Sequence, residues 1–112
     1  MSSRSNLAFV IAALCFAAGH AAAQKYPERV VRLVVPFTTG GGADVFARVI
    51  AQRLSETFGQ QMVVDNRPGG GSTVGTEYVA RATPDGYTLL MTSATFSFNP
   101  GLYPKLGYDS FK

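Results

Sequence analysis

The sequence contains no tryptophan, and its single cysteine and single histidine, Cys15 and His20, both fall near the beginning of the chain. Residues 24–112 therefore have neither a thiol nor an imidazole. An internal disulfide cannot form in this segment, and zinc sites built from cysteine and histidine are excluded. Serine or cysteine catalysis that depends on a histidine base is excluded for the same reason. We expect residues 24–112 to hold no metal site and no catalytic residue, and to need no cofactor.

An excess of charge of one sign is also lacking. Without Arg4, nine basic side chains remain against seven acidic ones, which leaves a net charge of +2. The arginines are scattered along the sequence, whereas a nucleic-acid footprint requires basic residues gathered in a patch or stripe. We therefore expect no nucleic-acid partner. A weakly cationic surface tolerates an anionic ligand without demanding one.

The first residues have the pattern of a secretory signal. Arg4 precedes an apolar run at residues 7–18, and small residues up to Ala23 provide an A-x-A cleavage site before Gln24. A basic start, an apolar run and a small-residue site in this order are typical of exported proteins. The run is shorter than the roughly 20 residues that cross a bilayer. We predict that residues 1–23 are a cleaved signal peptide; an uncleaved N-terminal anchor is the alternative.

Short apolar segments alternate with amphipathic ones in the following part of the chain. The expected strands are residues 30–35, 62–64 and 87–91, and the expected helices are residues 44–58 and 73–82. The first strand (VVRLVV) is β-branched and nearly continuously apolar, which fits a buried strand. Asp44 is placed to cap the first helix or to act as an acid in its first turn, and Gly59 is placed to end it. Asn99-Pro100 and Tyr103-Pro104 mark a loop or a short helix near the end of the sequence.

A polar or glycine-rich loop follows each expected strand. The order βαβαβ predicts an α/β fold with an open parallel sheet, in which ligands bind at the carboxyl ends of the strands. The candidate ligand-binding residues are Phe37, Thr38, Thr39, Gly40, Gly41, Gly42, Ala43 and Asp44 in the first loop, Gly71 and Ser72 in the second, and Thr92, Ser93 and Ala94 in the third. Unpaired backbone N–H groups around residues 40–42 can hold an anion. A strand-to-helix turn without a ligand explains the first loop equally well, and an arginine placed like Arg67 more often pairs with a neighbouring acid.

A nucleotide- or phosphate-dependent enzyme is the alternative from another functional class. The lysine of a phosphate-binding P-loop is missing. Gly40 and Gly42 match the start of a dinucleotide fingerprint, and Asp65 stands where a ribose-binding acid would follow. Val45, however, occupies the position of the third glycine. An exported structural or interaction module with incidental glycine turns is a third possibility.

Four signatures follow one another along the chain: VVPFTTGGGAD, VVDNRPGGGSTVGTE, PDGYTLL and NPGLYPKLGYD. With them, residues 26–112 resemble the substrate-binding proteins of tripartite tricarboxylate transporters, the Bug family. The resemblance implies a periplasmic, non-enzymatic receptor that closes on a di- or tricarboxylate or a related acid, and it implies a membrane permease as partner. The loop from Phe37 to Asp44 would hold a ligand carboxylate, with the loop at Thr92 nearby. The family usually has proline where Thr38 and Thr39 stand, and often threonine where Ala43 stands.

The resemblance also bears on domain organisation. It implies a two-lobed type II periplasmic-binding-protein fold, of which residues 24–112 would be the N-terminal part of the first lobe, with the second lobe absent. We expect a monomer, and we interpret the chain as a truncated form of a longer receptor. Weak or no ligand binding is then expected from the chain alone, because hinge closure needs both lobes.

Overall fold

The computed structural model describes residues 25–111, which include a parallel sheet of three strands. The strands are β1 (Val31–Val35), β2 (Met62–Asn66) and β3 (Thr88–Leu90), and their order in the sheet is β2-β1-β3. Both pairings of β1 are parallel, with Val31 opposite Met62 on one side. The predicted α/β fold with an open parallel sheet is therefore confirmed. The predicted signal peptide and its cleavage site lie outside the described residues.

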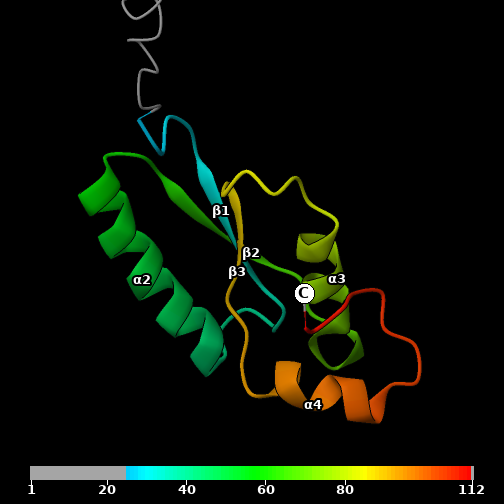
Figure 1. The fold of residues 1–112 in the computed structure, drawn as a ribbon. Helices are drawn as coiled ribbons and strands as arrows, with labels where there is room; N and C mark the ends of the chain where they lie inside the picture. Colours follow the sequence, from blue (N-terminus) through cyan, green and yellow to red (C-terminus); the bar gives the residue numbers. More distant parts are fainter. Residues whose placement is uncertain (1–24, 112) are drawn as a thin grey trace, which may run out of the picture.

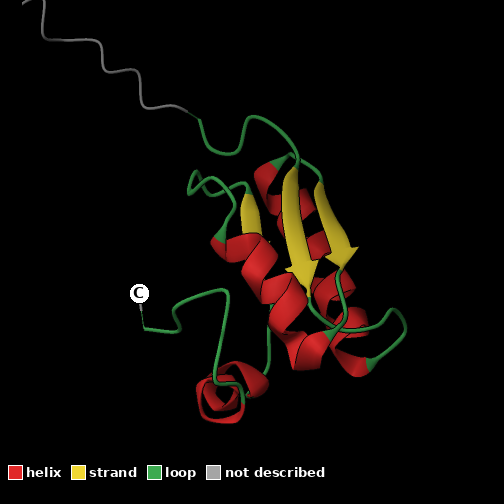
Figure 2. Ribbon diagram, turned by 90° about the vertical axis from the view of Figure 1, so that its right-hand side faces the viewer, coloured by secondary structure: helices red, strands yellow, loops and turns green. Residues whose placement is uncertain are grey.

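Helices cover both faces of this sheet (Figure 1, Figure 2). They are α2 (Gly42–Phe58), α3 (Thr73–Ala80) and α4 (Thr95–Leu102), with a 3-10 turn, η1 (Gly70–Ser72), directly before α3. α2 packs against β1 and β2 on one face, and α3 packs against β3 and β1 on the other. α4 lies beyond the ends of the strands, next to η1. Each crossover between parallel strands is thus made by a helix, as parallel pairing requires.

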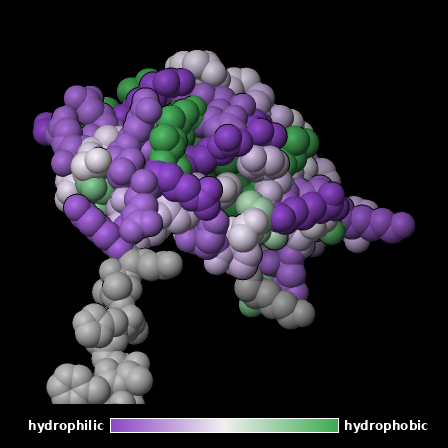
Figure 3. All heavy atoms as spheres, turned by 90° about the horizontal axis from the view of Figure 1, so that it is seen from above, coloured by the Kyte–Doolittle hydropathy of each residue, from purple (hydrophilic) through white to green (hydrophobic). Residues whose placement is uncertain are grey.

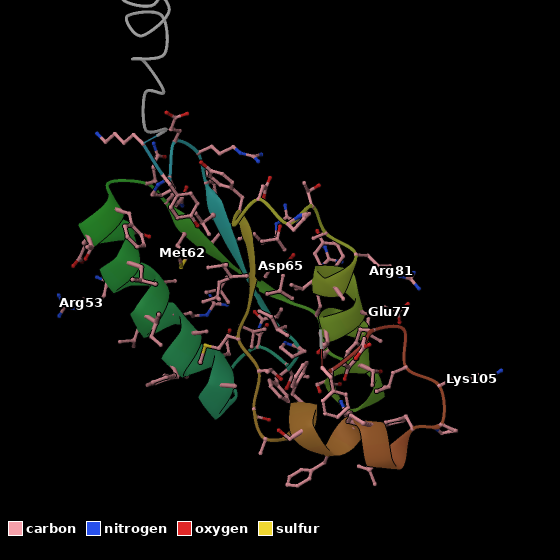
Figure 4. The ribbon with its side chains drawn as sticks, viewed as in Figure 1. Arg53, Met62, Asp65, Glu77, Arg81 and Lys105 are labelled. Atoms are coloured by element: carbon pink, nitrogen blue, oxygen red, sulfur yellow. The ribbon has the colours of Figure 1, made fainter. Side chains whose placement is uncertain are left out.

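The core lies between α2 and the sheet. It consists of Val31, Leu33 and Val35 of β1, Ala47 and Ala51 of α2, and Met62 of β2. The two alanines let α2 lie close to the strands, and Met62 packs between α2 and the sheet. Arg53, by contrast, points away from the sheet (Figure 4). Val34, on the opposite face of β1, is 0% exposed. The expectation of a buried first strand is confirmed, with Arg32 as its exposed exception.

The observed elements differ from the predicted ones at their ends. α2 begins at Gly42 rather than Asp44, so the last glycine of the first loop is already helical. β1 and β3 are shorter than predicted, and β2 continues to Asn66 because its whole length pairs with β1. α3 ends at Ala80, two residues before the predicted end. The segment around Asn99-Pro100, predicted as a loop or a short helix, is a short helix, α4.

Gly59 ends α2 as predicted. It has a left-handed conformation (φ 67°), and its N–H donates to the carbonyl of Ser55. The Ser55 hydroxyl donates to the carbonyl of Ala51 and accepts a hydrogen bond from the backbone N–H of Met62. The last turn of α2 is therefore bonded directly to the first residue of β2, which fixes the short connection between them.

The end of the sheet where the strands begin carries a separate polar cluster. The hydroxyl of Tyr26 donates to the carbonyl of Gly86, and Arg29 pairs with Asp85 at 2.7 Å while lying over the ring of Tyr87. Seen from this end, the surface is mostly hydrophilic, with small separate hydrophobic areas (Figure 3). These contacts hold the segment before β1 against the loop before β3.

Candidate functional site

The strand order defines one special point at the carboxyl edge of the sheet. The chain moves from β1 to β2 on one side, and then returns past β1 to β3 on the other. Where the direction of the strand order reverses in this way, the loops after the two neighbouring strands diverge and leave a crevice in which ligands bind. Here the reversal lies between β1 and β3. Of the predicted residues 37–44, residues 37–41 lie in the loop after β1 and residues 42–44 form the start of α2, whereas the loop after β3 contains residues 92–94.

Asp44 holds the first loop against the start of α2. The residue is 2% exposed, and its Oδ2 accepts hydrogen bonds from the backbone N–H of Gly40 at 2.9 Å and from Nε of Arg48 at 3.1 Å. These two donors, Arg48 first, lower the pKa of Asp44 from 3.8 to about 2, so the carboxylate is ionised at neutral pH. The expected role of a first-turn acid is confirmed. The N-cap itself is Gly41, which has no side chain to cap the helix.

This arrangement decides which backbone amides of the first loop remain available. The N–H of Gly40 is paired with Asp44, so the expectation of an unpaired amide at this position was wrong. The N–H of Gly41 points at the carbonyl of Thr38 at 3.5 Å, the limit of a hydrogen bond. Gly42 and Ala43 are the first residues of a 17-residue helix, which provides no acceptor for their amides. Free amides and the positive end of the helix dipole therefore coincide at Gly42 and Ala43.

Asn66 ties the first loop to the end of β2. Its Nδ2 donates to the carbonyl of Phe37 at 3.2 Å, and its Oδ1 accepts a hydrogen bond from Nη2 of Arg48 at 3.3 Å. Phe37 is half-buried and packs against the core, whereas Thr38 and Thr39 are exposed. The loop is thus anchored at both ends, and its two threonine hydroxyls lie at the surface.

The second loop makes a sharp turn from β2 into α3. Gly69, Gly70 and Gly71 all have positive φ, and Ser72 also does, at 78°. A left-handed conformation costs a non-glycine residue roughly 1–2 kcal/mol. Ser72 is 3% exposed, its carbonyl accepts a hydrogen bond from the Thr76 hydroxyl at 2.8 Å, and its own hydroxyl lies 3.1 Å from Oγ1 of Thr95. The surrounding contacts therefore hold a conformation that serine does not prefer.

The third loop is bonded to the second one. Oγ of Ser93 lies 3.1 Å from Oγ1 of Thr95, the same atom that contacts Ser72. Thr92 has a buried hydroxyl without a hydrogen-bond partner in the described part of the chain, and Ala94 is exposed. The structure thus brings the predicted residues of the second and third loops together. Within residues 25–111, no hydrogen bond joins residues 38–42 of the first loop to either.

Packing, rather than hydrogen bonding, places the first loop beside α3. A side-chain carbon on Gly75 would lie 2.8 Å from the carbonyl oxygen of Arg67 and 2.8 Å from Cβ of Pro36, the residue that begins the first loop. The absence of a side chain at Gly75 therefore permits the close approach of α3 to the chain leaving β1. The backbone N–H of Arg67 adds a hydrogen bond to the carbonyl of Val35.

The charged groups beside the second loop are occupied within the protein. Oδ2 of Asp65 lies 3.0 Å from Nε of Arg67 and 3.6 Å from Nη1 of Arg32, on the side of the sheet that faces α3 (Figure 4). The guanidinium of Arg67 also lies over the ring of Tyr78, 3.6 Å from its centre. The prediction that Arg67 pairs with a neighbouring acid is confirmed. The carboxylate of Asp65 is likewise engaged, which disfavours a role in binding a ribose.

Several residues of this edge were missed by the sequence analysis, and only Asn99 has a signal in the sequence. Arg48, Asn66, Thr95 and Asn99 connect the loops, yet none was among the predicted site residues. Asn99 stands in a mostly apolar segment, TFSFNPGL, and precedes a proline. An amide in such a segment indicates a buried hydrogen-bonding position, because buried polar groups need partners. The partners themselves come from parts of the chain far away in sequence.

Two further findings bear on the kind of site. In the described part of the chain, no helix has both the length and the apolar character needed to cross a membrane. No group of three or more acidic, histidine or cysteine side chains in residues 25–111 could hold a metal ion. The charged groups of Asp44, Arg48, Asp65 and Arg67 at the carboxyl edge are paired with one another, and the other polar groups there are backbone amides, hydroxyls and side-chain amides.

A match to a family model shows to which protein family the chain belongs. Residues 46–112 match the model described as the tripartite tricarboxylate transporter family receptor. The chain belongs to this receptor family. Protein BugT of Bordetella pertussis is 43% identical to it over 101 residues, which are 88% of this chain and 31% of BugT. The resemblance to the Bug family is confirmed.

Solved structures that are 40–49% identical to the chain have the same fold. The periplasmic binding protein BugD is 49% identical and superimposes with a TM-score of 0.74 over 77% of this chain and 29% of BugD. Rpa4515 of R. palustris, described with adipate, is 45% identical, with a TM-score of 0.72 over 76% of this chain and 29% of its own. MatC of Rhodopseudomonas palustris, described with bound malate, is 40% identical, with a TM-score of 0.71 over the same shares. The chain thus spans less than a third of the length of the relatives that it matches.

Proposed function

We propose that the chain contributes to a periplasmic receptor that binds a small organic di- or tricarboxylate, or a related acid, for a tripartite transporter. The observation that carries this proposal is the start of α2, where the amides of Gly42 and Ala43 lie at the carboxyl edge of the sheet without an intrahelical acceptor. The relatives described with adipate and with malate support it. The role proposed is binding without chemistry, as befits a receptor family.

In this proposal the anion is held by neutral donors. The guanidinium of Arg48 is engaged by Asp44 and Asn66, so it does not serve as the counter-charge. A ligand carboxylate accepts hydrogen bonds from the amides at the start of α2 and from the exposed hydroxyls of Thr38 and Thr39, with the helix dipole favouring its charge. The hydroxyl of Ser93, across the reversal point, is available to a second polar group of the ligand. Neutral donors also let the ligand leave again, which a receptor that delivers its cargo requires.

The remaining parts of the proposal concern the whole protein. Residues 24–112 would form the N-terminal part of the first lobe, the receptor would act as a monomer, and it would deliver its ligand to a membrane permease. Residues 1–23 would be removed during export. Mass spectrometry of the protein recovered from the periplasm would then give an N-terminus at Gln24, whereas an N-terminus at Met1 would contradict cleavage.

Titration of the exported protein with malate, adipate and citrate tests the binding function. We expect the two-lobed receptor to bind carboxylates, and not NAD or inorganic phosphate, with weak or no binding by the chain alone because hinge closure needs both lobes. A Thr38→Val substitution should weaken carboxylate binding roughly ten- to a hundredfold, because a hydrogen bond to a charged group contributes about 1.5–3 kcal/mol. Thr57→Val is the matched control: its hydroxyl is exposed on α2 but bonds to the carbonyl of Arg53, far from the loops. Tight binding of NAD or phosphate, without carboxylate binding, would contradict the proposal.

A further inference from the structure

One buried side chain connects three segments at the carboxyl edge. Asn99 of α4 is 2% exposed, and its Nδ2 lies within hydrogen-bond distance of three oxygen atoms: the carbonyl of Gly71 at 3.1 Å, Oγ of Ser72 at 3.2 Å and the hydroxyl of Tyr108 at 3.2 Å, which share its two N–H donors. Gly71 and Ser72 belong to the second loop, whereas Tyr108 lies in the segment after α4. A neutral amide donor is thus surrounded by three oxygen atoms.

The hydrogen bonds continue from Asn99 to the third loop. Oγ of Ser72 lies 3.1 Å from Oγ1 of Thr95, and Thr95 lies 3.1 Å from Oγ of Ser93. The chain Asn99–Ser72–Thr95–Ser93 therefore runs from a fully buried amide to an exposed hydroxyl at the predicted ligand loop. Networks of this kind specify one arrangement when every member is satisfied, and they are costly when one member is lost.

The network around Asn99 contacts a loop whose backbone is in an unfavourable conformation. Ser72 keeps a left-handed conformation, and a side-chain carbon on Gly71 would meet the hydroxyl of Tyr103 at 2.6 Å. The loop is therefore closely confined between α3 and the segment after α4. An unfavourable backbone conformation persists only when its surroundings over-determine it. The contacts of Asn99, together with those of Thr76 and Thr95, are the surroundings that hold Ser72 in place.

We infer that Asn99 is a positioning residue for ligand binding: it sets the place of Ser72 and, through Thr95, of Ser93. This inference rests on the proposed function, since it assigns a role to a residue that the ligand itself does not contact. The bond to Tyr108 leads away from the loops, so it contributes to stability but not to positioning. A positioning role predicts that changing Asn99 alters both malate affinity and amide hydrogen exchange in the two loops, whereas a purely structural role does not.

The test compares Asn99→Asp with Tyr108→Phe in the full chain. Asn99→Asp keeps the shape of the side chain and turns the amide donor into a carboxylate that faces the carbonyl of Gly71. Tyr108→Phe removes only the acceptor that lies away from the loops. Thr95→Val, which interrupts the network between Ser72 and Ser93, provides an independent variant that leaves Asn99 intact. Two readouts are measured: malate affinity, and amide hydrogen exchange in residues 70–73 and 92–95.

We expect Asn99→Asp to weaken malate binding at least about tenfold and to speed exchange in both segments at least about tenfold, because the hydrogen bonds to Gly71 and Ser72 are both lost and a carboxylate is left facing a carbonyl oxygen. Thr95→Val should speed exchange in residues 92–95 only, and Tyr108→Phe should leave both readouts within about twofold. Equal effects of Asn99→Asp and Tyr108→Phe, or unchanged exchange in residues 92–95 of Asn99→Asp, would overturn the inference. Binding by the unaltered chain alone is expected to be weak without the second lobe, so malate affinity is compared in the two-lobed receptor. If that receptor binds no acid, the proposed function fails, and the exchange comparison alone decides whether Asn99 positions the two loops.

Discussion

A methyl group placed on Gly75 should disturb the molecule at the base of the first loop. In Gly75→Ala the new carbon would lie 2.8 Å from the carbonyl oxygen of Arg67 and 2.8 Å from Cβ of Pro36, with Cα of Pro36 at 3.0 Å. Real side-chain carbons do not approach other atoms below 3.0 Å. Neither neighbour can rotate away, because one is a backbone atom and the other belongs to a ring. α3 must therefore move away from the chain that leaves β1.

Two opposing effects determine how much Gly75→Ala changes the free energy of unfolding. Overpacking a close contact costs typically about 1–3 kcal/mol. Alanine is better than glycine inside a helix by roughly 1 kcal/mol. Since the contact at Gly75 involves rigid atoms, the upper part of the first range applies, and we expect a net loss of about 2 kcal/mol in the free energy of unfolding. Ligand affinity should fall as well, because the shift displaces the first loop.

Gly101→Ala is the matched control. Gly101 is also in a helix, α4, but a side-chain carbon there would have nothing within 4 Å. Only the propensity effect remains, so this variant should be unchanged or more stable by up to about 1 kcal/mol. Urea unfolding followed by circular dichroism measures both variants. If Gly75→Ala were as stable as Gly101→Ala, the close approach of α3 to Pro36 would be wrong.

The remaining predictions concern the core, Asp44 and the surface. Val35→Ala should lower the free energy of unfolding by about 2 kcal/mol, because Val35 is 0% exposed and its lost methyl groups leave a cavity; a loss below about 0.5 kcal/mol in urea unfolding would argue against the assigned core. The pKa of Asp44 is lowered from 3.8 to about 2, so its stabilising contribution is complete above pH 3.8 and is lost as the pH falls through about 2. Asp44→Asn should therefore be less stable at neutral pH and show less acid sensitivity between about pH 4 and 2; parallel acid curves would contradict this. Glu56→Gln should change stability by less than about 0.5 kcal/mol, because its pair with Arg53 is exposed on both sides.

The alternation of apolar and glycine-rich segments was sufficient to predict the order of the elements. The continuous VVRLVV run is the central strand because it is buried on both faces, and Gly59 ends α2 because the left-handed turn suits glycine. Helix starts were less predictable. Gly42 is helical in the structure although glycine is a poor helix former, because the bond from Gly40 to Asp44 closes the turn in front of it.

The candidate site was predicted only in part. Loops after parallel strands meet at one edge by topology, so their convergence could be expected from the sequence. The pairing of the Gly40 amide and the network around Asn99 could not, because each depends on side-chain directions and on partners distant in the chain. Ser72 and Asn99, which are in contact, stand 27 positions apart. No local sequence pattern predicts a contact between residues so far apart in the chain.

The proposed ligand site is tested most directly by locating the residues at which a carboxylate binds. In a titration of the exported, isotope-labelled protein with malate, amide resonances of Gly42 and Ala43 should shift most, together with those of Thr38 and Ser93. The polar cluster at the other end of the strands, around Arg29 and Asp85, should stay unchanged and serves as the internal control. Shifts confined to that cluster, with the start of α2 unaffected, would contradict the assignment of the ligand to the carboxyl edge of the sheet.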